Sequence, residues 1–127
     1  IMRHAIELAA DYAKTRVTFG KPIAANQGIQ FMLADMKIAE ESARQLMLYA
    51  ARLCDAGENF QIAASAAKAY AGDCAMKVTT DAVQIFGGYG YSREYPVEKL
   101  MRDAKIFQIV EGTNQIQRVV ISGQLLK

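Results

Sequence analysis

Apolar residues recur every three or four positions along most of this chain, which is the spacing of one face of an α-helix. No run of five alternating apolar and polar residues indicates a strand. Glycine, proline and polar residues interrupt the helical pattern at only a few points, and these divide it into separate stretches. The stretches that we expect to be helical are residues 1–16, 26–56, 59–86, 97–104 and a last segment that begins after Thr113.

The two central stretches are about thirty residues each and predict helices ~45 Å long, at about 1.5 Å per residue. Because only a short turn at Gly57 joins them, they should lie antiparallel. Small residues in the third stretch, such as Ala63, Ala67 and Cys74, would let neighbouring helices approach closely. The pattern therefore predicts an all-α fold, an up-down four-helix bundle with long antiparallel helices.

The composition favours one folded domain over residues 1–127. With 52% hydrophobic and 22% charged residues, the chain can fill a core. A formal net charge of +2 lacks the clustered positive charge that nucleic acid or an anionic membrane would bind. No apolar run approaches the ~20 residues that cross a bilayer. We therefore expect neither nucleic acid nor membrane as a partner.

The cysteines and the histidine predict no metal site. Cys54 and Cys74 lack CxxC spacing and fall inside predicted helices, so we expect buried thiols in a reducing compartment. His4 is the single histidine and cannot anchor a metal cluster alone. The chain starts at Ile1, inside an apolar-periodic stretch and without an initiator methionine, so we expect a fragment of a larger subunit.

Three helix ends carry residues that a plain bundle does not need. At the first end, Arg16, Thr18 and Phe19 precede a turn at Gly20, and Gln27 follows it. Arginine presents a planar fork to phosphate, threonine adds a hydroxyl donor, and phenylalanine can stack on a base. The alternative is an ordinary helix end where basic residues offset the helix dipole.

The second irregular end is the run from Gln84 to Gly90, in which residues 87, 88 and 90 are glycine. Consecutive glycines let a backbone approach a ligand closely and offer it their N–H groups. The run lacks the strand-then-helix context of a nucleotide-binding fingerprint. The alternative is that these glycines only stop a helix.

The third irregular end holds Glu111, between the apolar Val110 and the flexible Gly112. A carboxylate in apolar surroundings can have a raised pKa and act as a general base. The alternative is an acidic residue placed favourably at a helix N-terminus, for which Thr113 is the expected N-cap. In the charged run before this end, Glu98 and Arg102 have the i,i+4 spacing of a solvated ion pair.

Taken together, these segments are similar to motifs of one enzyme family and occur in the family's order. They are residues 16–22, 30–36, 82–90 (Ala-Val-Gln-Ile-Phe-Gly-Gly-Tyr-Gly), 94–99, 102–106 and 111–118 (Glu-Gly-Thr-Asn-Gln-Ile-Gln-Arg). The chain resembles the C-terminal helical domain of the acyl-CoA dehydrogenase family over nearly its whole length. Within the family, it looks like the short- and medium-chain, butyryl-CoA-dehydrogenase-like members.

The resemblance implies a flavoenzyme that uses FAD to oxidise an acyl-CoA thioester to the trans-2-enoyl-CoA. Such enzymes pass electrons to electron-transfer flavoprotein and are usually homotetramers, as dimers of dimers, with FAD where subunits meet. Their N-terminal helical and middle β-domains would be absent from residues 1–127, so the chain alone is expected to be inactive. The expected location is the cytoplasm for a bacterial source and the mitochondrial matrix for a eukaryotic one.

The resemblance also implies roles for individual residues. Glu111 matches the catalytic base, whose backbone N–H polarises the thioester carbonyl in family members, together with a ribityl hydroxyl of FAD. Val110 and Gly112 match substrate contacts. The residues that match cofactor contacts are Thr113, Asn114 and Gln115 beside the base, and Arg16, Thr18, Phe19, Gln27, Gln84, Ile85, Phe86, Gly87 and Gly88 toward the FAD of a partner subunit.

Two features bear on the type of family member. A Glu at position 111 favours the short-, medium- or branched-short-chain type, because the isovaleryl and long-chain branches carry their base on an earlier helix. Val110 departs from the bulky aromatic residue that often precedes this Glu. The alternatives are a same-fold acyl-CoA oxidase, a dehydrogenase of another thioester, or an isolated helical oligomerisation module.

Overall fold

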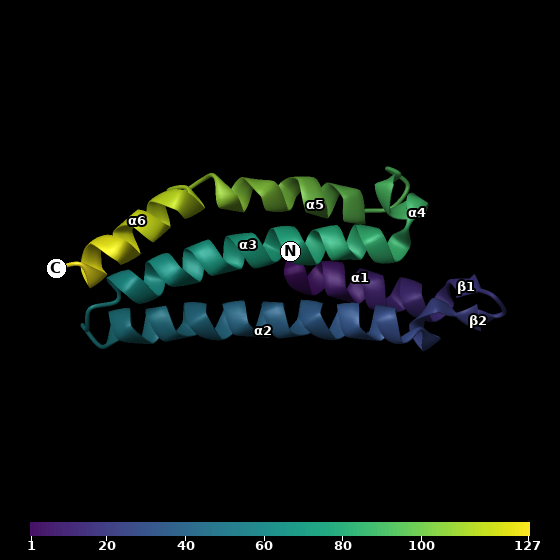
Figure 1. Ribbon diagram of the computed structural model, residues 1–127, viewed down its shortest axis with the longest axis horizontal. Helices are drawn as coiled ribbons and strands as arrows, with labels where there is room; N and C mark the ends of the chain where they lie inside the picture. Colours follow the sequence, from purple (N-terminus) through teal and green to yellow (C-terminus); the bar gives the residue numbers. More distant parts are fainter.

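The computed structural model describes all 127 residues, and it is almost entirely helical (Figure 1). Each predicted helix is present, and its ends lie within two residues of the expected positions. The helices are α1 (Met2–Thr15), α2 (Gln27–Asp55), α3 (Gln61–Phe86), α4 (Gly88–Tyr91), α5 (Val97–Lys105) and α6 (Asn114–Leu125), and the strands are β1 (Val17–Thr18) and β2 (Lys21–Pro22).

Helix α3 lies at the centre of the bundle and contacts α1, α2, α5 and α6 (Figure 1). Helices α2 and α3 run antiparallel on either side of the turn at Gly57, as the pattern predicts. The fourth member of the bundle is in two pieces, because α5 and α6 follow one another along α3 with a break between them. The all-α, up-down four-helix architecture is therefore confirmed, and one of its four members is interrupted.

Small side chains form the seams between the helices. Ala5, Ala9 and Ala13 place one face of α1 fully in the core. The buried residues of α3 are also mostly small, and they include Ala63, Ala67, Ala69, Ala75 and Ala82. Because such side chains keep neighbouring helix axes close, α3 can pack against helices on several sides at once.

The structure differs from the expectations at three places. Residues 17–22 form a two-stranded hairpin, and residues 88–91 form the extra short helix α4; both are too short to leave a periodic signal. Cys74 is buried, but Cys54 is exposed, so the prediction of two buried thiols is wrong for Cys54. It lies near the end of α2, on a face that no other helix covers.

Glu40 of α2 is buried although its charge suggests a solvated position. Lys37 Nζ donates to one of its carboxylate oxygens at 2.6 Å, and Arg44 donates to the other at 2.9 Å. The hydrogen bond from Lys37 lowers the pKa of Glu40, and with Arg44 it outweighs the opposing effect of burial. Two cationic neighbours thus compensate for the loss of solvent around this carboxylate.

Candidate functional site

The hairpin at one end of the bundle holds the first group of predicted site residues. Val17 pairs with Pro22 and Thr18 with Lys21, so that Phe19 and Gly20 form a two-residue loop. Both loop residues have positive φ, 50° and 77°, as a type I′ hairpin turn requires. Asparagine and glycine are the usual residues of such a turn, so phenylalanine at its first position is locally unfavourable.

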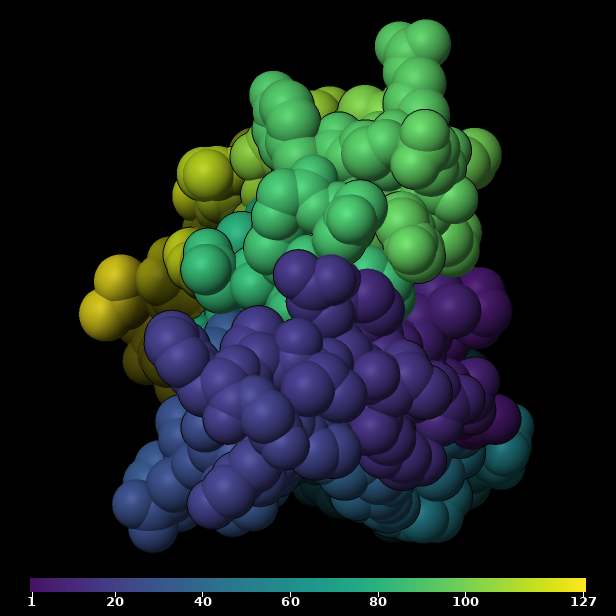
Figure 2. All heavy atoms as spheres, turned by 90° about the vertical axis from the view of Figure 1, so that its right-hand side faces the viewer, coloured from purple at the N-terminus to yellow at the C-terminus, as the bar shows by residue number.

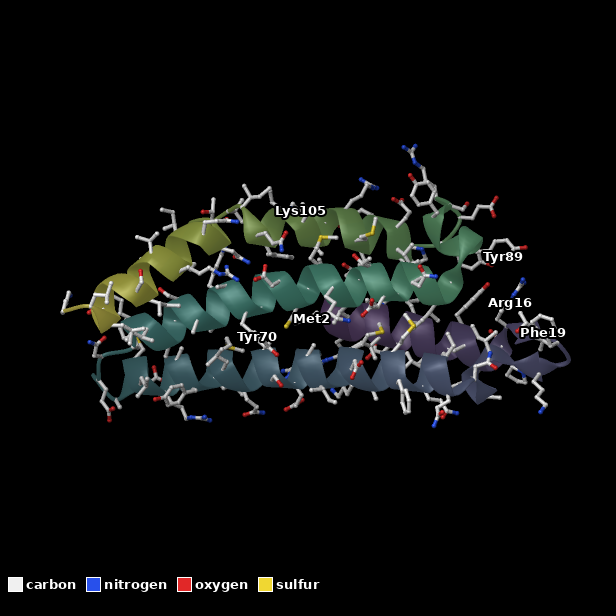
Figure 3. All side chains as sticks on the ribbon, viewed as in Figure 1. Met2, Arg16, Phe19, Tyr70, Tyr89 and Lys105 are labelled. Carbon is white, nitrogen blue, oxygen red and sulfur yellow. The ribbon has the colours of Figure 1, made fainter.

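Phe19 is also fully exposed. It belongs to the loop of the hairpin, at the end of the bundle where Arg16 and Tyr89 are also labelled (Figure 3). The fold does not need phenylalanine here, because its backbone is in a disfavoured conformation and its side chain packs against nothing. A smaller residue would serve the fold equally well. The position of Phe19 is instead consistent with contact to a group outside this chain.

A groove of about 560 Å³ opens between the hairpin and the end of α3. In Figure 2 this end faces the viewer, with the hairpin segment in purple below the green segment around α4. The predicted residues that line the groove are Arg16, Thr18, Ile85, Phe86, Gly87 and Gly88. Tyr89, Ser92 and Glu94 also line it. Tyr89 and Glu94 fall within the family-like segments 82–90 and 94–99, but the sequence predicts no role for any of the three.

Arg16 and the two glycines give this groove groups that suit an anionic ligand. The Arg16 guanidinium lies over the Tyr89 ring, 5.3 Å from its centroid, and has no ion-pair partner. A Cβ added at Gly87 or Gly88 would meet no atom within 4 Å, so the backbone there is open to solvent. An unpaired guanidinium beside exposed backbone is a setting in which phosphate is bound.

The predicted residues at this end differ in how far their side chains are exposed. Ile85 and Phe86 are buried, and Phe86 stacks on Tyr12 with ring centroids 4.0 Å apart, so their side chains belong to the core. Gln27, in the first turn of α2, and Gln84, near the end of α3, are exposed and lie outside the lining of the groove.

The second group of predicted residues occupies the break between α5 and α6. Glu111 and Gly112 both have positive φ, 56° and 81°. This conformation is disfavoured for glutamate and acceptable for glycine. A Cβ at position 112 would also lie 2.9 Å from the side-chain nitrogen of Gln117. The sharp turn therefore needs glycine at 112, and it holds Glu111 in a strained backbone conformation.

Glu111 lines an apolar pocket of about 340 Å³ between the break and helix α3. Neither carboxylate oxygen of Glu111 is hydrogen-bonded within the chain. The other lining residues are Ile1, Met2, Lys68, Ala71, Gly72, Ala75, Phe107 and Val110. The predicted substrate-contact residue Val110 is thus beside Glu111, whereas Gly112 is not part of the lining. The pocket offers one carboxylate against a mainly apolar wall.

The following residues lie on a different, polar side of the same break. Thr113 and Gln115 line a separate pocket of about 350 Å³ with Lys105 and Arg118. Thr113 caps α6 as predicted, because its hydroxyl oxygen accepts a hydrogen bond from the Ile116 N–H at 3.2 Å. The hydroxyl hydrogen of Thr113 remains free to donate to a ligand.

Asn114 is buried, and its side chain is occupied within the chain. Its amide nitrogen donates to the backbone oxygen of Ala69 at 3.0 Å and to Asp73 at 2.9 Å. Its amide oxygen accepts from Lys68 Nζ at 2.8 Å. Both donors of the side chain are therefore used, so this predicted cofactor residue serves the packing of the break onto α3.

Asp73 and Gly72 are residues of this region that sequence reasoning missed. Asp73 accepts hydrogen bonds from Gln108, Asn114 and Arg118 at 2.8, 2.9 and 2.7 Å. Partial burial acts to raise the pKa of Asp73, but these three donors, Arg118 foremost, outweigh it and lower the pKa. The only sequence signal is that Lys68, Gly72 and Ala75 share one face of α3 by their spacing.

The two groups of residues are separated along α3. Gly72 packs against Asn114 in the break, and Phe86 marks the groove at the hairpin. Phe86 is fourteen positions after Gly72, which corresponds to roughly 21 Å along the helix at about 1.5 Å per residue. The structure therefore brings the predicted residues together as two sites and not as one.

Three further observations describe the chemistry that the chain offers. No three His, Cys, Asp or Glu side chains come together in an arrangement that could hold a metal ion. No helix combines the length and apolar character needed to cross a membrane. The predicted ion pair between Glu98 and Arg102 is present, at 2.7 Å.

Comparison with known proteins identifies the fold and the family. Residues 1–126 match the family model described as "Acyl-CoA dehydrogenase, C-terminal domain". The chain belongs to the acyl-CoA dehydrogenase family. It is 59% identical, over 99% of its length and 33% of the relative's, to an acyl-CoA dehydrogenase of Bacillus subtilis. The family resemblance inferred from the motifs is therefore confirmed.

Solved structures of acyl-CoA dehydrogenases and their relatives share the bundle. Butyryl-CoA dehydrogenase from Megasphaera elsdenii matches with a TM-score of 0.97 at 54% identity, over 99% of this chain and 33% of its own. A chain in a structure described by the electron transferring flavoprotein of Acidaminococcus fermentans matches at 0.96 and 52%, over 99% and 33%. An FAD complex of PigA matches at 0.94 and 28%, over 98% and 32%. The chain thus spans about one third of the proteins it matches.

Proposed function

We propose that residues 1–127 are the C-terminal domain of a larger acyl-CoA dehydrogenase subunit. This subunit would remove hydrogen from the α and β carbons of a short- or medium-chain acyl-CoA to give the trans-2-enoyl-CoA. The observation that carries the proposal is the position of Glu111, an unbonded carboxylate at the edge of an apolar pocket, in a chain of this family. N-terminal helical and middle β-domains would complete the subunit.

The apolar pocket suits the acyl chain of such a substrate. Ala71, Ala75 and Phe107 offer it carbon surface, and Val110 adds a branched side chain beside the carboxylate. Burying apolar surface there stabilises the complex by roughly 25 cal/mol per Å². A chain seated against this wall would bring its thioester end toward Glu111.

Glu111 would then accept the α-proton of the substrate. Its carboxylate is not engaged by any residue of this chain, so no internal hydrogen bond has to break before the proton is transferred. The backbone N–H of Glu111 also takes part in no helix hydrogen bond. It is available to donate to the thioester carbonyl and so to stabilise the charge that develops on that oxygen.

FAD fits the two sites that the structure separates. The Arg16 guanidinium and the open backbone at Gly87 and Gly88 suit its pyrophosphate, and Thr113 with Gln115 suits a polar part of another copy near the base. The bound flavin would supply the acceptor for the hydride that leaves the β carbon. As the family resemblance implies, one cofactor site would be shared between two subunits, in a homo-oligomer such as a dimer of dimers.

Electron-transfer flavoprotein is the proposed acceptor of the electrons. A structure that contains such a flavoprotein includes a chain 52% identical to this one, which supports the assignment. Rapid oxygen consumption with acyl-CoA in the absence of this acceptor would instead favour an oxidase. The acyl-chain length stays a prediction that the pocket beside Val110 makes testable.

The decisive experiment is the variant Glu111→Gln in the complete, flavin-loaded enzyme. The amide keeps the size of the side chain but cannot accept a proton as the carboxylate does. We expect the rate of flavin reduction by butyryl-CoA to fall by about 10²–10⁴-fold, the usual contribution of general acid–base catalysis. Anaerobic stopped-flow absorbance of the flavin measures that rate.

The matched control is Glu58→Gln, an exposed glutamate in the turn between α2 and α3. It should leave the rate of flavin reduction unchanged. Flavin content and acyl-CoA affinity should be normal in both variants. A Glu111→Gln enzyme that reduces its flavin at the normal rate would show that this carboxylate is not the base.

A further inference from the structure

The turn that carries Glu111 has a strained backbone, and the Glu111 side chain makes no hydrogen bond that would stabilise it. Its φ is positive, and its side chain has no hydrogen bond. Only its backbone oxygen is engaged, as the acceptor of a 3.2 Å hydrogen bond from the Gln117 side chain. A residue in a disfavoured backbone conformation persists only where the surrounding structure holds it there. The contacts that hold Glu111 must therefore be made by residues on either side of it.

Asp73 of α3 contacts residues on both sides of that turn. One of its carboxylate oxygens accepts from Gln108, three residues before Glu111, at 2.8 Å, and from Asn114, three residues after it, at 2.9 Å. The second oxygen accepts from Arg118, one turn further along α6, at 2.7 Å. A single carboxylate thus connects Gln108, in the turn that follows α5, to Asn114 at the beginning of α6, with Glu111 midway between them.

Gly72 shows that the fit between α3 and the break is close. A Cβ at this position would lie 3.0 Å from the Asn114 amide nitrogen and 3.0 Å from the backbone oxygen of Phe107. Gly72 is therefore what lets the backbone of α3 approach the break. Asn114 completes the contact, because its amide also donates to the backbone oxygen of Ala69. The break therefore contacts α3 at Ala69, Gly72 and Asp73, which lie within about one helical turn.

The hydrogen-bond donors around Asp73 stabilise its carboxylate in the charged form. Three hydrogen bonds reach its two oxygens, and one of them comes from a guanidinium, so the ionised carboxylate is the form that the site stabilises. Hydrogen bonds to a charged group are individually stronger than those between neutral groups. The hydrogen bonds of Asp73 lower its pKa despite partial burial, so it is ionised at neutral pH.

We infer that Asp73 is a positioning residue, which holds the turn between Gln108 and Asn114 so that the Glu111 carboxylate faces the apolar pocket. The inference rests on the proposed role of Glu111 as the base. Asp73 also lines the polar pocket of Thr113 and Gln115, but its carboxylate oxygens are engaged by Gln108, Asn114 and Arg118, so it acts through the turn. Loss of its carboxylate should therefore impair proton abstraction much more than it impairs binding.

The test is Asp73→Asn in the complete enzyme, with Asp81→Asn as the matched control. Asp81 lies two turns further along α3 and forms an ion pair with Lys77 of the same helix. Misplacing a reacting group by about 1 Å can cost about 10²-fold in rate. We expect flavin reduction by butyryl-CoA to slow by about 10–100-fold in Asp73→Asn and to be unchanged in Asp81→Asn.

Binding measurements separate positioning from a general loss of structure. The dissociation constant for acyl-CoA and the flavin content of Asp73→Asn should stay within about threefold of the parent, so the effect falls on kcat and not on KM. The double variant with Asn114→Ser should be no slower than the slower single variant, because both changes release the same turn. A rate that falls only in proportion to lost flavin would overturn the inference.

Two further outcomes keep the test decisive. If Asp73→Asn does not accumulate as folded enzyme, Gln108→Met removes just one of the three donors and should still slow reduction several-fold. A normal rate in Asp73→Asn, with Glu111→Gln inactive, refutes the positioning role and leaves the proposed function intact. Normal rates in both variants refute both.

Discussion

Arg16 and Phe19 lie at the hairpin end of the bundle and form no ion pair; the Phe19 side chain is fully exposed, and the Arg16 guanidinium lies over the Tyr89 ring. Glu111, in contrast, lies between residues that are hydrogen-bonded to the central helix on both sides. Both regions contain a non-glycine residue with positive φ. The strain is the same kind in each, but the residues beside Phe19 are fixed only by pairing within the hairpin, whereas those around Glu111 are hydrogen-bonded to the central helix.

This difference corresponds to two tasks. A group that binds a cofactor from outside the chain needs unpaired donors and free surface, which the hairpin end supplies. A group that transfers a proton must be held near one geometry, since reaction rate depends steeply on position. The three predictions below test whether the hairpin end serves affinity and the break serves placement.

Of the three variants that compare the two regions, the one expected to have the largest effect removes the guanidinium at the hairpin end. Arg16→Gln should weaken flavin binding in the complete enzyme by about 10–100-fold, since a hydrogen bond to a charged group contributes about 1.5–3 kcal/mol. Fluorescence titration of the apoenzyme with FAD measures this. Arg52→Gln, an exposed arginine near the far end of α2, should leave the affinity unchanged. Equal affinity in the Arg16 variant would remove phosphate recognition from this end.

A smaller effect separates the fold of the hairpin end from its binding role. A Cβ at Gly90 would lie 2.6 Å from the backbone oxygen of Val83 and 2.7 Å from the Phe86 Cβ, so Gly90→Ala should destabilise the protein by about 1–3 kcal/mol. Denaturant unfolding measures it. Gly88→Ala, which meets open space, should weaken flavin binding with little change in stability. If the two variants changed stability and flavin affinity in the same way, the folding role of Gly90 and the binding role of Gly88 would not be separate.

Sequence reasoning reached the helices and their ends because periodicity and local residues determine them. The cap at Thr113 and the pair of Glu98 with Arg102 are interactions within one helix, so spacing alone predicts them. The burial of Asn114 and the role of Asp73 depend on residues 35 to 45 positions apart in the chain. No local pattern records such a contact, and the exposure of Cys54 was missed for the same reason.

The smallest expected effect is the pH dependence of the stabilisation that the Asp73 carboxylate gives to the break between α5 and α6. The pKa of Asp73 is lowered in the folded state, so its contribution to stability is present above its unfolded value and is lost as pH falls through the folded value. Asp73→Asn should therefore lower the thermal midpoint more at pH 7 than at pH 3. Arg16→Gln should have the same small effect on the midpoint at both pH values. If Asp73→Asn lowered the thermal midpoint equally at both pH values, the ionised Asp73 carboxylate would not be what stabilises the break.

The alanine-rich surface of α3 also limits which amino-acid substitutions this domain can accept during evolution. At Ala63, Ala67, Ala75 and Ala82, nearly every random substitution adds volume, because only glycine is smaller. Enlarging side chains in a tightly packed seam displaces backbones, and α3 borders helices on several sides. Sequence drift in this family should therefore be slow on α3 and faster on the outward face of α2, where a larger side chain meets only solvent or a partner.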